Sequence, residues 1–319
     1  MKAAKHFLAL AISAAIIVAI FSQIDLAEFS GIFSEIKWAW FLAGLVCFVP
    51  VYMVLISRLR FLTGADLAAA DALRLILAAS SLNTVLPSKG GDLVKGVFIK
   101  RYTGRDLKDG LSIVVLERVS DLTALVLIMV IGLIALGDFA IEGAIAWAIG
   151  LALMAGSAFY IFMHLYNFDE DGVIRFLRRI PKIGGLYDAS RLLVRQQFAG
   201  GGIARVFAYS LASWIIQLIQ FICFFWALGF DGPLTSIVAL VPAAIVIGLL
   251  PITVAGFGTR DLAMIMLFAP WASAEMMAGV ALLSHLRYIL PGLAGLLSVR
   301  RLLAETASAE QATSVPGPG

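Results

Sequence analysis

The charged residues inside the apolar sequence are the ones whose types and positions suggest chemistry. Arg287 lies near the middle of a long apolar segment, two residues after His285. A central arginine costs roughly 2.5–3.5 kcal/mol to insert into a membrane on biological scales, so it should face the protein interior and pair with an acid. We expect that acid to be Asp261 or Glu117. The alternative to a binding role is a purely structural salt bridge.

A second group of charges lies in the sequence Leu-Glu-Arg-Val-Ser-Asp, which begins at Leu116. On a helix, Glu117 and Asp121 lie one turn apart on a shared face, and Arg118 can pair with Asp121 at the i,i+3 spacing. The group is either a buried network or an interfacial cluster at the start of a shortened span. If it is buried, its charges require partners.

Two stretches rich in Gly and Pro interrupt the apolar sequence. The first is Leu86-Pro87-Ser88-Lys89-Gly90-Gly91-Asp92-Leu93-Val94-Lys95, and the second runs from 250 to 262. In each stretch a Leu-Pro pair (Pro87 or Pro251) ends a helix, glycines follow, and a capping residue (Asp92 or Thr259) begins the next helix. At membrane depth such a loop persists only where it is buried in protein or lines a wet cavity. The spacing from Pro to Asp differs, so the plan is similar without being a strict repeat.

Helix N-termini carry partial positive charge and unpaired N–H groups. We expect the helices that begin at Asp92 and Arg260 to point these ends toward the membrane interior. Such ends, together with cationic side chains, suit a lipid phosphate. The alternative is that the loops are interfacial connections, with Lys89 reaching water. The candidate headgroup-binding residues are Lys89, Gly90, Gly91, Asp92, Lys95, Gly256, Gly258 and Arg260, and the candidate intramembrane charges are Glu117, Arg118, Asp121, Asp261, His285 and Arg287.

The composition identifies an integral membrane protein. The chain has 319 residues, is 61% hydrophobic and has a mean hydropathy of +0.97, whereas soluble domains are about half apolar. Two cysteines lie in apolar runs and three histidines are scattered, so we expect neither a disulfide nor a metal site. No zinc motif, phosphate-binding loop, dinucleotide fingerprint or nucleophile elbow is present, so we expect no cofactor, catalytic residue or nucleic-acid partner.

Hydropathy and charge predict an all-α, polytopic membrane bundle. Basic residues flank one end of the spans, which places both termini in the cytoplasm of an inner-membrane protein. Six full spans fit this orientation only if each broken segment is re-entrant, which means that it enters and leaves the membrane on the same side. The first would enter from the cytoplasm and the second from outside, an arrangement typical of inverted-repeat transporters. We expect one domain over 1–303, with halves 1–137 and 138–303, and a disordered cytoplasmic tail over 304–319. The six expected spans are 7–24, 38–57, 112–136, 141–166, 206–230 and 276–299.

Three amide side chains and one basic segment also fit a membrane bundle. Asn83, Gln217 and Gln220 could hydrogen-bond between helices. The sequence over 173–180 is typical of a basic amphipathic helix on the anionic inner leaflet.

Three motifs in order resemble the transmembrane flippase-like domain of the lysylphosphatidylglycerol synthases. They are the stretch from Leu86 to Lys95, the Leu-Glu-Arg-Val-Ser-Asp-Leu sequence, and Pro-Ile-Thr-Val-Ala-Gly-Phe-Gly-Thr-Arg-Asp. The resemblance covers the chain to about Leu303 and implies translocation of lipids with charged or glycosylated headgroups. Asp261 replaces an expected Glu and Ala255 a common Gly, which leaves the headgroup open. The matching motif positions are Pro87, Gly91, Asp92, Glu117, Arg118, Pro251, Gly256, Gly258 and Arg260.

The sequence favours a lipid flippase-like protein over two other functions. One alternative is a secondary transporter of a small anionic metabolite, and the other is an accessory subunit of a membrane enzyme that makes lipids or glycans. The soluble aminoacyltransferase domain of the full synthases is absent from the sequence, so we do not expect an enzyme. The expected partners are membrane lipids and, for an accessory subunit, a membrane enzyme, and the oligomeric state is not predicted.

Overall fold

The computed structural model of the protein is a bundle of helices. It describes residues 2–64, 67–85, 90–137, 181–199, 202–249, 253 and 256–314, together with 150 and 156. Every regular element in these ranges is a helix, which confirms the predicted all-α class. The expected span 141–166, the expected amphipathic helix 173–180, and Pro87, Lys89 and Pro251 lie outside the described residues.

Four helical segments in the described ranges are long and apolar enough to cross a membrane, or five if one bent pair counts as a span. The bent pair is α1 (Lys2–Gln23) and α2 (Leu26–Ser34), which turn by 88° at Asp25. The turn is fixed because the Asp25 carboxylate accepts hydrogen bonds from two N–H groups at the start of α2. The other segments are α3 (Trp38–Val46) with α4 (Phe48–Leu62), α7 (Leu107–Leu136), α11 (Gly202–Ala227), and α14 (Ala274–Ser314) as far as Leu302.

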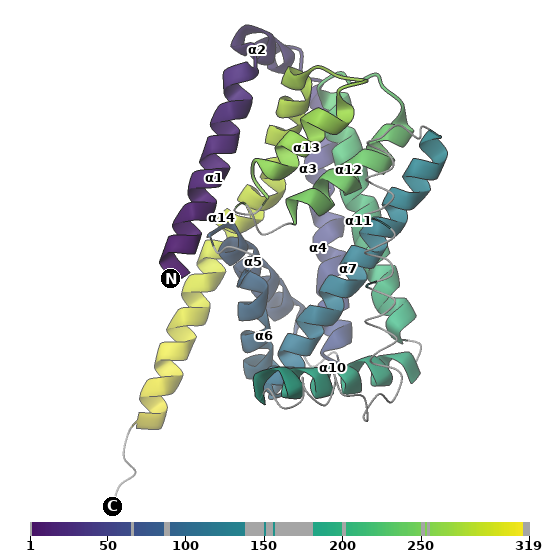
Figure 1. Cartoon of the computed structure of the whole chain (residues 1–319). Coiled ribbons are helices and arrows are strands. Elements are labelled where there is room, and N and C mark those ends of the chain that lie inside the picture. Colours follow the sequence, from purple (N-terminus) through teal and green to yellow (C-terminus); the bar gives the residue numbers. More distant parts are fainter. Residues whose placement is uncertain are drawn as a thin grey trace, which may run out of the picture.

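Two helix pairs are broken where Gly and Pro predicted it. The first pair is α5 (Ala69–Val85) and α6 (Gly90–Thr103), and the second is α12 (Leu234–Gly248) and α13 (Thr259–Phe268). The two helices of each pair pack against each other. Figure 1 places α5 and α6 in the lower half of the bundle and α12 and α13 in the upper half. The two pairs therefore occupy opposite ends of the bundle.

The starts of α6 and α13 differ from the expected ones. Helix α6 begins at Gly90, so Asp92 lies in its first turn instead of capping it. Helix α13 is capped by Gly258 instead of Thr259, because the Asp261 carboxylate accepts the Gly258 N–H at 2.9 Å. Gly258 has φ +93°, a conformation that glycine adopts at low cost.

The C-terminal helix extends further than expected. Helix α14 continues to Ser314, into the segment that the sequence predicts to be a disordered tail. The residues from 304 to 312 include four alanines and three Glu or Gln residues, which are good helix formers. Helix α10 (Pro181–Ala199) lies across the lower end of the bundle (Figure 1).

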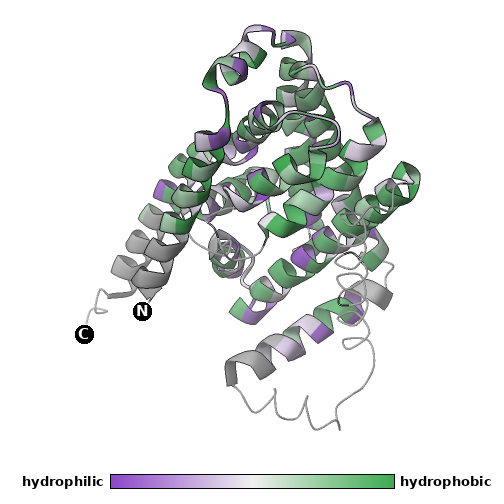
Figure 2. Cartoon of the chain, turned by 45° about the horizontal axis from the view of Figure 1, so that its top comes forward, coloured by the Kyte–Doolittle hydropathy of each residue, from purple (hydrophilic) through white to green (hydrophobic). Residues whose placement is uncertain are grey.

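Two large hydrophobic cores hold most of the described bundle together, and a small third one joins Ile20 of α1 and Ile24, just after that helix, to Ala278 of α14. The upper core joins α7, α11, α12, α13 and α14 around Phe221, Phe224, Phe225 and Phe268. The lower core joins α4, α5, α6 and α7 around Leu59, Leu75, Ile99 and Ile113, with α10, α11 and α14 at its edge. Hydrophobic residues make up most of the bundle (Figure 2), as expected for helices that face lipid on one side. The polar residues described next are exceptions within this apolar body.

Candidate functional site

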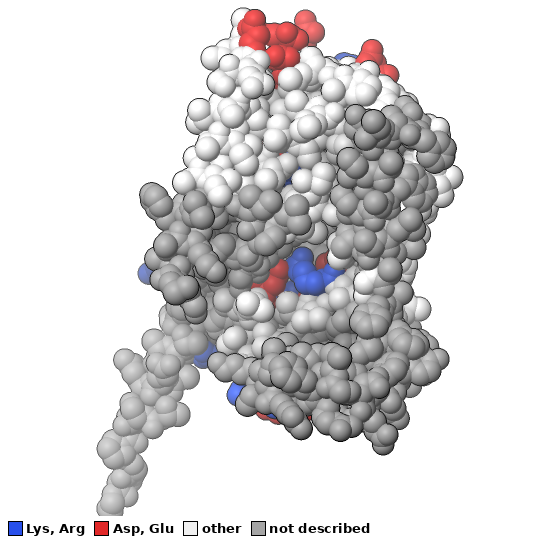
Figure 3. All heavy atoms as spheres, in the orientation of Figure 1, with Lys and Arg blue, Asp and Glu red and all other residues white. Residues whose placement is uncertain are grey.

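A polar cavity of about 190 Å³ lies inside the bundle. Figure 3 shows acidic and basic atoms together in a hollow at mid-height, well below the acidic atoms at the top of the molecule. Helices α4, α5, α6, α7, α11 and α14 form the wall. The charged residues that line it are Arg58, Asp92, Lys95, Glu117, Arg118, Asp121 and Arg287.

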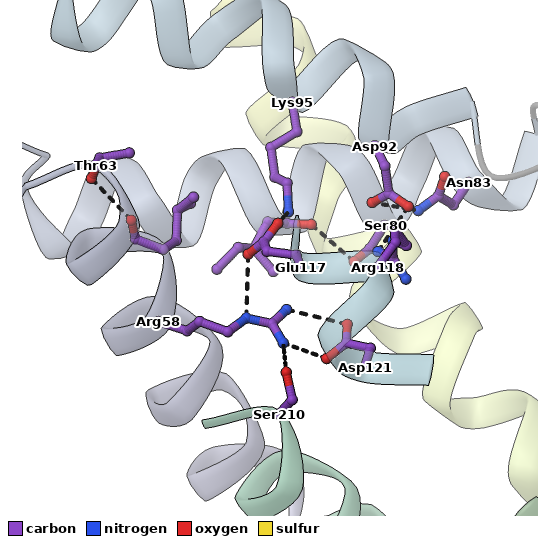
Figure 4. Close-up of polar contacts among 12 residues, drawn as sticks. Arg58, Thr63, Ser80, Asn83, Asp92, Lys95, Glu117, Arg118, Asp121 and Ser210 are labelled. Carbon is purple, nitrogen blue, oxygen red and sulfur yellow. Dashed lines mark hydrogen bonds and ion pairs between the residues drawn. The ribbon is translucent and has the colours of Figure 1, made fainter. Parts of the chain in front are cut away.

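Glu117 lies at the centre of the ionic network in the cavity wall. Its carboxylate projects from α7 and contacts Arg58 Nε of α4 at 3.3 Å and Lys95 Nζ of α6 (Figure 4). The Glu117 side chain is only 2% exposed, and both cations are also buried. Glu117 and Asp121 therefore belong to a largely buried network and not to an interfacial cluster, whereas the Arg118 side chain is 42% exposed.

Arg58 joins the two carboxylates of α7. In addition to Glu117, its guanidinium group pairs with Asp121 one turn further along, and its Nη1 donates to Ser210 Oγ of α11 at 2.9 Å. The predicted pair between Arg118 and Asp121 is therefore wrong. A neighbouring helix supplies Asp121 with a guanidinium that makes two contacts, which is a stronger arrangement than a single contact within one helix.

Arg118 turns instead toward the first broken helix pair. Its Nη2 lies 2.8 Å from Asp92 Oδ2, and Asn83 Nδ2 donates to Asp92 Oδ1 at 3.3 Å. Asp92 thus links the end of α5, the start of α6 and the middle of α7 (Figure 4). The expected inter-helix roles are also present at Gln220, which donates to the Gly44 carbonyl at 2.9 Å, and at Asn83.

In the part of the chain that the structure describes, Arg287 is the cavity cation that has no carboxylate partner. The other six charges form ion pairs with one another, three cations with three carboxylates. Arg287 donates to the Gln217 side-chain carbonyl and lies 4.5 Å above the Phe221 ring. Neither Asp261 nor Glu117 is its partner, so that prediction is wrong. Among the described residues Arg287 contacts no carboxylate, and its buried Nη1 has no hydrogen-bond acceptor.

A second polar cluster lies at the start of α13. The Asp261 carboxylate accepts from Gly258 N–H at 2.9 Å, contacts Arg260 Nη2 at 3.3 Å and lies 3.0 Å from His285 Nε2. Arg260 is 2% exposed, and its guanidinium carbon is 5.0 Å from the centre of the Tyr288 ring. Tyr288 lines the cavity, whereas Arg260, Gly256 and Gly258 do not. The expected single phosphate site is therefore divided, with Asp92 and Lys95 in the cavity wall and the α13 cluster behind Tyr288.

The glycines of the two loops have packing roles. A Cβ on Gly91 would lie 2.3 Å from the Ala79 carbonyl oxygen, so Gly91 lets α6 approach α5 closely. Gly256, with φ +77°, lies similarly close to the Gly248 carbonyl of α12. Gly90 is the first residue of α6.

Sequence reasoning missed Arg58 and Trp214. Arg58 looked like a basic residue closing a span at Ser57, but α4 continues to Leu62 and carries Arg58 into the interior. The apolar residues on both sides of Arg58 were a usable signal. Trp214 lines the cavity from α11, and its buried Nε1 has no hydrogen-bond partner in the described part of the chain. Nothing in its local sequence distinguished it from an interfacial tryptophan.

Comparison with known proteins gives two matches. Residues 6–295 match the family model described as the lysylphosphatidylglycerol synthase TM region. The chain is also similar to the UPF0104 membrane protein MJ1595 of Methanocaldococcus jannaschii, with 23% identity over 333 aligned positions that span 94% of this chain and 95% of the relative. No solved structure matches the chain.

Proposed function

Because this chain belongs to the family of lysylphosphatidylglycerol synthase transmembrane regions, we propose that it binds the anionic headgroup of a membrane lipid in its cavity and moves that headgroup across the membrane. The observation that carries this proposal is Arg287. Its positive charge faces a cavity inside the bundle and lacks a carboxylate partner among the described residues. A buried charge of this kind is costly unless a counterion is supplied.

A lipid phosphate would supply the missing counterion. Arg287 Nη1 and Trp214 Nε1 are both buried, both belong to residues that line the cavity, and neither has an acceptor among the described residues. Phosphate oxygens accept hydrogen bonds from such donors, and those to a guanidinium group are strong because both partners are charged. The ligand class that fits the two donors is therefore anionic, and a glycosylated headgroup that carries a phosphate fits equally well.

The position of the cavity favours a lipid over a small soluble anion. Figure 3 shows charged atoms in a hollow on the side of the bundle, at mid-height between its two ends. The Arg118 side chain is 42% exposed although it belongs to the cavity wall. A lipid can place its headgroup in such a side opening while its acyl chains stay in the bilayer, whereas a soluble metabolite must enter from one end.

The charge distribution supports an orientation in the inner membrane. Acidic atoms gather at the top of the molecule (Figure 3), where α2 lies (Figure 1), and the segment that joins α6 to α7 at the lower end carries four basic residues against two aspartates. Since cytoplasmic loops are enriched in Lys and Arg, we place the lower end and both termini in the cytoplasm. The acidic residues are Asp25, Glu28, Glu35, Asp231 and Glu275, and the basic ones are Lys100, Arg101, Arg105 and Lys108.

The test is lipid movement in reconstituted vesicles. Phosphatidylcholine vesicles carry a trace of phosphatidylglycerol with a fluorescent acyl chain, and a reductant that cannot cross the membrane bleaches the outer leaflet. The wild-type protein should move the inner-leaflet probe to the outer leaflet, where it is bleached. Arg287→Gln should lower the rate of this movement at least about tenfold, because the variant loses one charge-assisted hydrogen bond to the headgroup. Arg74→Gln is the matched control, because Arg74 pairs with Asp71 outside the cavity.

Other outcomes would favour the other functions. No lipid movement across several anionic and glycosylated headgroups would contradict the proposal. Uptake of a soluble organic anion without lipid movement would support a secondary transporter. Co-purification with a membrane enzyme, combined with no transport by the protein alone, would support an accessory subunit.

A further inference from the structure

His285 is a titratable side chain held directly against a buried carboxylate. Its Nε2 lies 3.1 Å from Oδ1 and 3.0 Å from Oδ2 of Asp261. Histidine gains or loses a proton near neutral pH more readily than other side chains. The His285 side chain is 17% exposed, so it is not sealed from its surroundings.

Asp261 is fixed in place whether or not His285 is charged. The Gly258 N–H and Arg260 Nη2 both contact the carboxylate, so Asp261 keeps a donor and a counterion when His285 is neutral. With neutral His285 the cluster has one cation and one anion. A proton on His285 raises the net charge of the cluster to one positive charge without removing the carboxylate.

The charged groups that face this cluster come from two helices. Helix α13 contributes Arg260 and Asp261, and helix α14 contributes Arg287 and Tyr288 beside His285 itself. Among the described residues, the other elements beside the cluster present neutral groups: Ser13 and Ile16 of α1 near Gly258, Gly248 of α12 near Arg260, and Gln217 of α11 at Arg287. The α2 end of α14 carries Glu275, which accepts from the Asp25 N–H.

The cluster connects to the cavity through Tyr288. The Arg260 guanidinium lies 5.0 Å from the Tyr288 ring, and Tyr288 lines the cavity next to Arg287. His285 and Arg287 are two residues apart on α14, so their charged ends are separated by roughly 10 Å. At that distance, with an effective dielectric constant near 20, two unit charges change each other's binding equilibrium about tenfold.

We propose that His285 and Asp261 form a proton-binding site, and that a proton binds there together with the anionic headgroup that binds at Arg287. This proposal rests on the proposed function and names its coupled ion. A proton on His285 adds a second unbalanced positive charge near Arg287, and the anion compensates for it. Binding of the anion must in turn favour the proton by the same factor. One proton and one singly charged headgroup then move without net charge transfer.

The first test is the pH dependence of binding. The probe is a short-chain phosphatidylglycerol, because its phosphodiester keeps one negative charge between about pH 5 and 8 and so does not itself titrate. Intrinsic tryptophan fluorescence reports binding to the detergent-purified protein, since Trp214 lines the cavity. Wild-type affinity should be about tenfold higher at the acidic end. His285→Gln should bind with the alkaline wild-type affinity throughout, whereas His6→Gln and His164→Gln should retain the pH dependence.

The second test needs no variant. In weakly buffered solution containing a pH indicator, the wild-type protein should bind at most about one proton for each lipid that it binds. Binding with constant affinity and no proton uptake would overturn the proton site and leave the proposed function intact. A tenfold pH dependence that persists in folded His285→Gln would also overturn it. No binding by the wild-type protein at any pH would overturn the proposed function itself.

Discussion

The two broken helix pairs share a sequence plan but use their charges differently. The α5–α6 pair directs Asp92 and Lys95 outward to Arg118 and Glu117 of α7, and so builds one wall of the cavity. In the α12–α13 pair, Asp261 contacts the Gly258 N–H at the start of its own helix and His285 of α14, and it does not line the cavity. A Leu-Pro break followed by Gly and Asp therefore predicts a helix interruption but not what the interruption does.

The same difference distinguishes the residues that support the cavity from those that respond to its ligand. The ion pairs around the first helix pair are balanced, three cations against three carboxylates, so this network needs no ligand. Arg287 has an unbalanced charge, and the second cluster can acquire one at His285. We therefore assign the α4–α6–α7 network to holding the cavity open and the α13–α14 residues to responding to what enters it.

The largest expected effect on stability is at Glu117. Glu117→Gln removes the carboxylate between buried Arg58 and Lys95, and breaking a buried pair typically costs about 3–5 kcal/mol. Asp261→Asn should cost less, because an amide oxygen still accepts the Gly258 N–H and Arg260 stays stacked on Tyr288. Thermal unfolding of the two detergent-purified variants measures the contrast. Equal losses would show that the second cluster is as structural as the first.

The loop glycines should show the next largest difference. Gly91→Ala places a Cβ 2.3 Å from the Ala79 carbonyl and 2.8 Å from the Asn83 nitrogen, both backbone atoms that cannot move aside. Overpacking of this kind costs about 1–3 kcal/mol and should shift α6 away from α5.

A Cβ at Gly258 would lie 3.1 Å from the Ile16 side chain and 3.5 Å from the Ser13 carbonyl oxygen, so the main cost of Gly258→Ala comes from φ +93°, about 1–2 kcal/mol. Gly31→Ala, which lies in α2 with no atom within 4 Å of the added Cβ, is the control and should stabilise by about 0.5–1 kcal/mol. A mild effect at Gly91 combined with a severe one at Gly258 would reverse the assignment of tight packing to the first pair.

The sequence predicted the helix breaks and most spans because those signals are local. A Pro without an N–H, neighbouring glycines and a run of apolar residues act within a few positions of themselves. The breaks after Val85 and after Gly248 are where these residues place them. Arg287 and Arg118 were also predicted to be intramembrane charges from their immediate surroundings, and both line the cavity.

The ion-pair partners could not be predicted, because they depend on how distant helices pack. Arg118 pairs with Asp92 on another helix instead of Asp121 on its own, and Arg287 contacts an amide from α11 instead of an acid. Arg58 entered the network only because α4 continues past the predicted end of its span. A single sequence gives the positions of charges along a helix but not the angle at which the next helix meets them.

The smallest effect on stability is expected at Arg74, and the sharpest comparison is between Arg74 and Arg118, two partly exposed arginines. Arg118 and Arg74 are 42% and 41% exposed, and each pairs with one aspartate. The two partners differ in burial, because Asp92 is 8% exposed and Asp71 is 24% exposed. Arg74→Gln should therefore cost about 0–1 kcal/mol, as is typical of exposed pairs, whereas Arg118→Gln should cost more because it leaves a buried carboxylate without its cation. The two variants should also differ in binding. Arg118→Gln leaves the Asp92 charge unbalanced in the cavity wall and should weaken anionic-lipid binding about tenfold, whereas Arg74→Gln changes no cavity residue.

Lipid titration of both variants by tryptophan fluorescence gives the result directly. Equal affinities would mean that the charge balance around the first helix pair does not affect the affinity for the lipid, and that Arg287 alone determines anion binding. A loss confined to Arg118→Gln would show that the neutral network contributes to binding because it is neutral: each carboxylate in the wall has to be matched by a cation before Arg287 can attract a headgroup.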